Sequence, residues 1–139
     1  DHVRGSHLIV QASFRHALVL QVPCERRIIF VIPLDPEHVL LGTTEQKHDI
    51  SDPIVCTDAE SAYLLEILNQ HLSEPLAASD IVSSFAGVRP IVRPRDTAPG
   101  DISSASRDSE IEISDRLISV FGGKWTSARH LGEKVASLV

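Results

Sequence analysis

Short apolar segments, separated by polar or proline-containing breaks, fill the first third of the chain. Each segment is rich in Val, Ile and Leu, a composition typical of β-strands. Connections this short join antiparallel neighbours, because parallel strands need a long crossover between them. The pattern therefore predicts an antiparallel meander, with turns at residues 22–27 and 34–38 and with Pro36 suited to a turn position. The expected strands are HLIVQ (7–11), ALVLQV (17–22), RIIFVIPL (27–34) and HVLLGTT (38–44).

The spacing of the apolar positions changes at Thr57. Thr57 and Glu60 fit the capping box, in which an N-cap hydroxyl is followed by a glutamate three residues later. Apolar residues then recur every three or four positions, and Pro75 is expected to end the helix. This pattern predicts an amphipathic helix that packs on the core and contributes structure rather than chemistry. Its apolar stripe comprises Ala62, Leu64, Leu65, Ile67, Leu68 and Leu72.

The second half of the chain again favours strands. Residues 80–92 are expected to form a strand, and residues 93–109 form a surface loop rich in Pro, Asp, Ser and Gly. The alternation in EIEIS (110–114) predicts a half-exposed strand, and RLISVFGG (116–123) predicts the last one. A final helix is expected from about Thr126, with Leu131, Val135 and Leu138 on one stripe. The predicted fold class is α+β with a largely antiparallel sheet.

The composition is that of a soluble globular protein. The 139 residues, 42% of them hydrophobic, suffice for one compact domain, and the longest apolar runs are far too short to cross a bilayer as a helix. The formal net charge of −6 argues against a general nucleic-acid binder. The N-terminus lacks the charged-then-apolar pattern of a signal peptide.

The cysteines and histidines show no metal-binding spacing. Cys24 and Cys56 could pair in principle, but a reduced cytoplasmic pair is the expectation. The 7 histidines form no close ligand grouping, so no metal site is predicted. The sequence also has no glycine-rich dinucleotide fingerprint and no P-loop, so redox chemistry would need parts that lie outside it.

The stretch FGGKWTSAR (121–129) follows an apolar run and opens the last predicted helix. Gly122 and Gly123 allow another group to approach the backbone, and free N–H groups at a helix start attract anions. Lys124 adds a full positive charge, so the segment is a candidate anion site. A plain flexible turn, with Thr126 and Ser127 as N-caps, is the alternative.

Several motifs occur together in one order. They are GSH (5–7), IFVIP (29–33), GTTE (42–45), GVRPIV (87–92), SRD (106–108) and SVFGGKWT (119–126). In this order they resemble the flavin-dependent glycerol-3-phosphate dehydrogenases over essentially the whole chain. The resemblance implies a single substrate-binding domain over residues 1–139, similar to that of the D-amino-acid-oxidase-like flavoproteins. It also implies that the FAD-binding Rossmann part and a C-terminal helical domain are missing, so that this chain alone is inactive.

The resemblance implies a definite chemistry for the intact enzyme. Its substrate would be sn-glycerol 3-phosphate, oxidised to dihydroxyacetone phosphate by hydride transfer to FAD, with a quinone as the electron acceptor. The intact protein would be cytoplasmic, with peripheral association with the cytoplasmic membrane. No nucleic-acid partner is expected.

Four side chains would form the substrate site by this resemblance, and each has a structural alternative. His7 would handle the alcohol proton, because imidazole titrates near working pH, or it is a surface histidine at a strand entry. Arg89, between Gly87 and Pro90, would stabilise a developing alkoxide, or it forms a structural salt bridge. Arg107, which Asp108 could orient, would bind the substrate, or it is an ordinary solvated arginine after a polar loop. Lys124 would also bind the substrate, with the flexible turn as its alternative. All four are expected to converge on one wall of a common pocket.

The cofactor contacts implied by the resemblance lie in two motifs. The backbone of Lys124, Trp125 and Thr126, with Gly122 and Gly123, would lie near the pyrimidine end of the flavin. Trp125 departs from the family, where a smaller apolar residue is more usual. Thr43 and Thr44 would lie near the flavin, or they make only local hydrogen bonds at a strand end.

Two other functions stay open. One is the substrate domain of another FAD-dependent oxidoreductase, acting on an amine or a 2-hydroxy acid, since such an enzyme also uses arginines for its anion. The other is a non-catalytic interaction module. In addition, RGSH (4–7) resembles the scar of an expression tag, in which case residues 1–6 would not be native. A glycine-serine-histidine triplet in the family favours a native His7.

Overall fold

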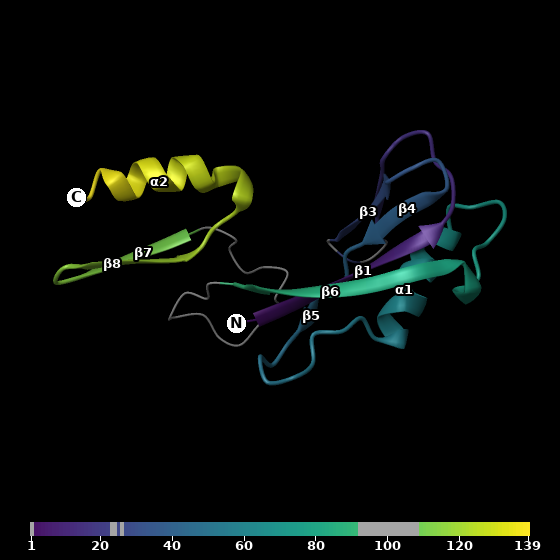
Figure 1. The fold of residues 1–139 in the computed structure, drawn as a ribbon, viewed down its shortest axis with the longest axis horizontal. Helices are drawn as coiled ribbons and strands as arrows, with labels where there is room; N and C mark the ends of the chain where they lie inside the picture. The colour runs from purple at the N-terminus through teal and green to yellow at the C-terminus, as the bar shows by residue number, and fades with distance from the viewer. Residues whose placement is uncertain (1, 23–24, 26, 92–108) are drawn as a thin grey trace. The chain divides into compact units, whose positions relative to one another are not determined.

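The computed structural model describes residues 2–22, 25, 27–91 and 109–139. The chain divides into two compact units, which Figure 1 shows as ribbons. The sheet unit comprises His2–Arg89, and the hairpin unit comprises Pro90–Val139. Each unit is described by itself. The predicted loop at 93–109 and the SRD motif fall almost entirely on residues 92–108, outside the described part.

The sheet unit is built on one six-stranded sheet in which β1 is the central strand. The strand order is β2-β3-β4-β1-β5, and β6 also pairs with β1. The predicted meander is confirmed for β2, β3 and β4, whereas β1 pairs with β4 rather than with β2. The strands are β1 (His2–Gln11), β2 (Leu18–Gln21), β3 (Ile28–Pro33), β4 (His38–Gly42), β5 (Gln46–Lys47) and β6 (Ile81–Pro90).

The turn between β3 and β4 forms where the sequence predicts it. The Asp35 carboxylate accepts hydrogen bonds from the backbone N–H groups of Glu37 and His38, both at 2.8 Å. This is the local bonding by which an aspartate stabilises a turn. The other predicted turn, at 22–27, includes residues 23, 24 and 26, which lie outside the described part.

The core lies between the sheet and helix α1 (Asp58–Asn69), which contacts β1. Alternate residues of the strands point toward α1, as the period of two requires. Full burial of one such aliphatic side chain contributes roughly 1.5–3 kcal/mol, so this cluster provides the unit's main stabilisation. Its members are Leu8, Val10, Leu20, Val22, Ile29, Val31, Val39, Leu41, Leu64, Leu65, Ile67 and Leu68.

Helix α1 begins as predicted but ends early. Its capping box is complete, with Thr57 as N-cap and Glu60 at the third helical position. The prediction that Pro75 ends the helix is wrong, because the last helical residue is Asn69. The Asn69 side chain exchanges hydrogen bonds with the backbone of Leu76 at 2.8 and 2.9 Å, which draws the chain back before the proline is reached. Of the predicted stripe, Ala62 is exposed.

The hairpin unit consists of a two-stranded sheet and a helix. Strands β7 (Ser109–Ser114) and β8 (Leu117–Gly122) confirm the two predicted strands and pair antiparallel. Asp115 in the two-residue turn has φ 53°, the left-handed conformation that tight hairpin turns need. Helix α2 (Ala128–Ala136) follows a short 3₁₀ turn, Trp125–Ser127.

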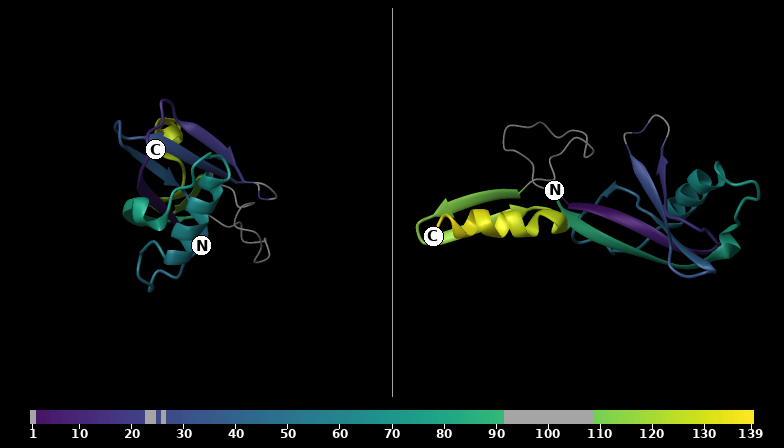
Figure 2. Two further views of the ribbon diagram at one scale, coloured as in Figure 1. Left: turned by 90° about the vertical axis from the view of Figure 1, so that its right-hand side faces the viewer. Right: turned by 90° about the horizontal axis from the view of Figure 1, so that it is seen from above.

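Helix α2 lies alongside the hairpin in Figures 1 and 2. Gly123 has φ 101°, and a Cβ there would stand 3.3 Å from Leu131 Cδ2. Glycine therefore allows both the turn and the close return of the helix. Within residues 109–139 no side chain is buried. The predicted class, α+β with a largely antiparallel sheet, is confirmed. No helix in the described part is long and apolar enough to cross a membrane.

Candidate active site

A β-bulge brings the GSH and GTTE motifs together. His7 pairs with Gly42, whereas Arg4 pairs with Gln46. The three residues Thr43–Glu45 therefore stand opposite only two residues of β1, which defines a bulge. A Cβ on Gly5 would stand 3.2 Å from the Thr44 carbonyl oxygen and closer still to the Thr43 hydroxyl. The glycine of GSH is thus the residue that lets the Thr43–Glu45 bulge approach β1.

His7 lies over Gly42 and against Phe85. A Cβ on Gly42 would stand 2.9 Å from His7 Cγ, so the glycine of GTTE makes room for the imidazole. The ring stacks on Phe85 of β6, with centroids 5.0 Å apart and an angle of 8° between the planes. His7 Nδ1 is buried and has no hydrogen-bond partner among the described residues.

The surroundings of His7 favour its neutral form. Burial lowers the pKa of His7 below its ordinary value of 6.5, and the positive charge of Arg89 lowers it further. Both effects penalise the imidazolium. At neutral pH the ring is therefore uncharged and can accept a proton, as a general base must.

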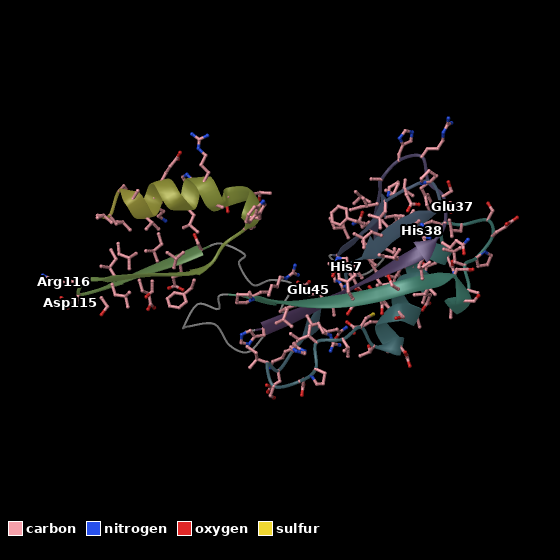
Figure 3. The ribbon with its side chains drawn as sticks, in the orientation of Figure 1. His7, Glu37, His38, Glu45, Asp115 and Arg116 are labelled. Atoms are coloured by element: carbon pink, nitrogen blue, oxygen red, sulfur yellow. The ribbon has the colours of Figure 1, made fainter. Side chains whose placement is uncertain are left out.

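Arg89, the second predicted catalytic residue, lies near His7 and forms an ion pair. Its Nη2 donates to Glu45 Oε1 at 2.6 Å. Glu45 is the last residue of the bulge, and its side chain is only 9% exposed, whereas that of Arg89 is 41% exposed. Arg89 Nε is buried and has no partner among the described residues. The structural salt bridge foreseen as an alternative is present, on a side chain that is partly exposed. Figure 3 labels His7 and Glu45.

Glu60 is a residue of this region that sequence reasoning identified only as a helix cap. Its carboxylate is buried and accepts hydrogen bonds from five groups on three segments. Oε1 accepts from the hydroxyls of Ser6 at 2.9 Å and Thr44 at 2.7 Å. Oε2 accepts from Arg4 Nη2 at 2.7 Å and from the Thr57 backbone and hydroxyl at 3.1 and 2.9 Å.

These hydrogen bonds decide the charge of Glu60. Burial alone would raise its pKa, but the bonds from Thr44, Thr57 and Ser6 outweigh burial and hold the pKa at about 2. Glu60 is therefore ionised at neutral pH. Only the capping box signalled it in the sequence, because Ser6 lies 54 residues and Thr44 16 residues away along the chain.

The predicted threonine pair has a structural role on this side of the bulge. Thr44 is buried, and besides its bond to Glu60 its hydroxyl accepts from the Ser6 N–H at 2.9 Å. The Thr43 hydroxyl donates to the Thr44 carbonyl at 3.0 Å, and Arg27 Nη2 donates to the Thr43 carbonyl at 3.3 Å. The alternative of local hydrogen bonding is thus observed, and a flavin contact stays a prediction.

The predicted anion segment lies in the hairpin unit. Gly122 and Gly123 both have positive φ, 71° and 101°. Lys124 stands at the start of the 3₁₀ turn, which has no side-chain cap, and the Trp125 side chain is 94% exposed. Ser127 is the N-cap residue of α2, as the alternative expected, but its side chain makes no capping bond and its hydroxyl donates to the Lys124 carbonyl at 3.1 Å.

The structure thus unites only part of the predicted site. His7 and Arg89 lie together in the sheet unit, beside Thr43 and Thr44. Lys124 lies in the hairpin unit, and Arg107 lies outside the described residues. The convergence of all four side chains on one pocket wall remains a prediction. Among the described residues no group of His, Cys, Asp and Glu side chains could hold a metal ion, and Cys56 is a free thiol.

Comparison with known protein families identifies the class of protein to which this chain belongs. A family model described as "DAO: FAD dependent oxidoreductase" matches residues 1–138. The chain belongs to this family of FAD-dependent oxidoreductases.

Within this class the similarity is to dehydrogenases of polyol phosphates. Glycerol-3-phosphate dehydrogenase of Pseudomonas aeruginosa is 39% identical over 94% of this chain and 26% of its own length. D-erythritol 1-phosphate dehydrogenase of Brucella abortus is 32% identical, over 95% of this chain and 27% of its own length. The chain therefore spans about a quarter of the length of these relatives.

A solved structure is similar over the same extent. The glycerol-3-phosphate dehydrogenase of Bacillus halodurans, in complex with FAD, has a TM-score of 0.72 and 32% identity, over 99% of this chain and 26% of that one. The resemblance inferred from the ordered motifs is thereby confirmed.

Proposed function

We propose that this chain is the substrate-binding part, over residues 1–139, of a flavoenzyme that oxidises sn-glycerol 3-phosphate to dihydroxyacetone phosphate. The observation that carries the proposal is the neighbouring pair of His7, kept neutral, and Arg89, a permanent cation whose side chain is partly exposed. An alcohol oxidation needs a group that removes the hydroxyl proton and a charge that stabilises the developing alkoxide. The names of the relatives supply the substrate class, a phosphate monoester of a polyol.

The residues of this chain divide the work. His7 accepts the proton of the substrate's secondary hydroxyl, while Arg89 faces the oxygen on which negative charge develops. Lys124, and by the resemblance Arg107, bind the phosphate. FAD, when bound, would supply the acceptor for the hydride on the carbon that bears this hydroxyl, and a quinone would be the final electron acceptor.

The segment from Gly122 to Thr126 fits the edge of a flavin. Two consecutive glycines with positive φ precede a 3₁₀ turn whose N-cap side chain, that of Lys124, makes no capping hydrogen bond. Donors in such a place stabilise negative charge on a reduced ring. Thr43 and Thr44 border the same cofactor in this proposal. A quinone lies in the membrane, so the proposal includes peripheral membrane association of the intact enzyme, on the cytoplasmic face by the resemblance.

The experiment uses the full-length protein loaded with FAD. Dye reduction dependent on glycerol 3-phosphate is measured for the wild type and for His7→Asn and Arg89→Lys, with His16→Asn and Arg15→Lys as controls in an exposed loop. We expect kcat/KM to fall by about 10²–10³ for the first two variants and to stay unchanged for the controls. Residues 1–139 alone are expected to show no turnover.

The same assay separates the rival functions. An enzyme for amines or 2-hydroxy acids would oxidise a 2-hydroxy acid and ignore the phosphate ester. A non-catalytic module would leave turnover unchanged in His7→Asn and Arg89→Lys. Either result would overturn the proposal.

A further inference from the structure

Glu60 makes more hydrogen bonds than a helix cap requires. A capping box uses one glutamate oxygen, which accepts from the N-cap backbone N–H. Here Oε2 fulfils that role through Thr57, and it also binds Arg4. The other oxygen, Oε1, takes no part in capping and, within the described part of the chain, accepts from Ser6 and Thr44. A buried carboxylate that is satisfied on both oxygens fixes the position of every donor that it binds.

The two residues that donate to Oε1 are adjacent in sequence to residues of the candidate site. Ser6 precedes His7 on β1, so the two side chains point to opposite faces of the sheet. Thr44 precedes Glu45, which holds Arg89. Glu60 Oε1 therefore links β1, which carries His7, to the Thr43–Glu45 bulge. The bulge in turn carries Glu45, the ion-pair partner of Arg89.

We propose that Glu60 is a positioning residue, which sets the distance between His7 and Arg89 by clamping Ser6 to the Thr43–Glu45 bulge. This inference rests on the proposed function. Two bonds between β1 and the bulge do not involve Glu60, one from the Thr44 N–H to the Ser6 carbonyl at 3.2 Å and one from the Ser6 N–H to the Thr44 hydroxyl at 2.9 Å. Without Oε1 the bulge keeps these bonds and its glycine-permitted approach, but Ser6 and Thr44 lose the shared carboxylate oxygen that ties both of them to α1.

The first test is kinetic and uses the full-length holoenzyme. Glu60→Gln has the same shape but lacks the charge and one acceptor, and Ser6→Ala removes one bond to Oε1 while the capping box stays intact. We expect kcat to fall between about tenfold and a hundredfold in Glu60→Gln, with a smaller change in KM, because misplaced groups lose contacts of the transition state. Ser6→Ala should show a smaller fall in the same direction.

Two controls separate positioning from loss of stability. Glu66→Gln changes an exposed glutamate of the same helix, and Leu68→Ala destabilises the core of α1 without touching the clamp. A Leu68→Ala enzyme that melts as early as Glu60→Gln should keep its kcat. If it loses kcat to the same degree, Glu60 acts through stability alone and the proposal fails.

The second test does not depend on the reaction. In a crystal structure of the full-length Glu60→Gln enzyme, we expect the ion pair between Arg89 and Glu45, 2.6 Å in the wild type, to lengthen beyond hydrogen-bond reach. An unchanged pair would refute the positioning role. If the wild type fails to oxidise glycerol 3-phosphate, only the proposed function fails, and the variant structure still decides the role of Glu60.

Discussion

At the scale of single residues, His7 and Arg89 determine the pH range in which the proposed base works. Burial and the charge of Arg89 both hold the pKa of His7 below 6.5. Activity requires the neutral imidazole, so kcat/KM should be lost at a lower pH than for an ordinary histidine, as the pH falls through the lowered pKa of His7. A pH profile of kcat/KM measures this acid limb directly.

Substitution of Arg89 tests whether its charge sets the pH at which the acid limb of the kcat/KM profile falls. In Arg89→Gln the positive charge is absent, so the pKa of His7 rises and the limb moves to higher pH. Arg89→Lys keeps a charge there, and its limb should stay closer to that of the wild type. A limb in the same place for both variants would show that Arg89 does not influence His7, and a limb that persists in His7→Asn would belong to another group.

Glu60 predicts how folding stability depends on pH. Its pKa lies at about 2 instead of the ordinary 4.5, so its contribution is complete above 4.5 and disappears as the pH falls toward 2. The shift corresponds to a contribution on the order of 3 kcal/mol to the free energy of unfolding. Urea unfolding between pH 7 and pH 2.5 should therefore show a steeper acid loss for the wild type than for Glu60→Gln. Glu66→Gln should follow the wild type.

At the scale of elements, the glycines around the bulge are expected to differ sharply in their tolerance of a side chain. A Cβ on Gly5 would collide with Thr43 and press on the Thr44 carbonyl, whereas a Cβ on Gly87 would meet nothing within 4 Å. We expect Gly5→Ala to lower the free energy of unfolding by roughly 1–3 kcal/mol, the usual cost of overpacking. Gly87→Ala is the matched control and should be neutral or slightly stabilising. Thermal or urea unfolding of both variants checks this, and equal stability would show that the bulge can move away from β1.

The elements that sequence predicted well are those with local causes. Thr57 and Glu60 define the start of α1 because a capping box is formed within four residues, and the alternation of EIEIS defines β7 for the same reason.

The contacts that the sequence could not predict are those between distant segments. The end of α1 could not be predicted because the Asn69 side chain bonds to the backbone of Leu76, and no local sequence pattern indicates that contact. The hydrogen bonds from Ser6 and Thr44 to Glu60 could not be predicted from the sequence, because the Glu60 carboxylate reaches these residues only when α1 packs on the sheet. The order of the motifs identified His7 and Arg89 as a pair. That Glu45 is the ion-pair partner of Arg89 follows only from the bulge in the structure.

At the scale of the whole molecule, the two units differ in what stabilises them. The sheet unit has a continuous core of twelve buried apolar side chains between sheet and helix. The hairpin unit has no buried side chain within residues 109–139, and its large apolar residues Ile113, Leu117, Phe121 and Trp125 are exposed. Its partly buried apolar side chains are Ile111, Ile118, Leu131 and Val135, and backbone hydrogen bonds join its two strands. A two-stranded hairpin of this kind is marginally stable in water.

This difference predicts the order in which the backbone opens. Amide hydrogen exchange is governed by local unfolding, which needs least free energy where few apolar groups are buried. In the 139-residue chain, amides of β7, β8 and α2 should exchange much faster than those of β1, β3 and β4, when both are followed by mass spectrometry under native conditions. In full-length enzyme the hairpin amides should become protected, because the exposed apolar residues and the cofactor segment at Gly122–Thr126 would then be covered. Equal protection of both units in the 139-residue chain would contradict this account, since it would require the hairpin unit to have a source of stability other than burial.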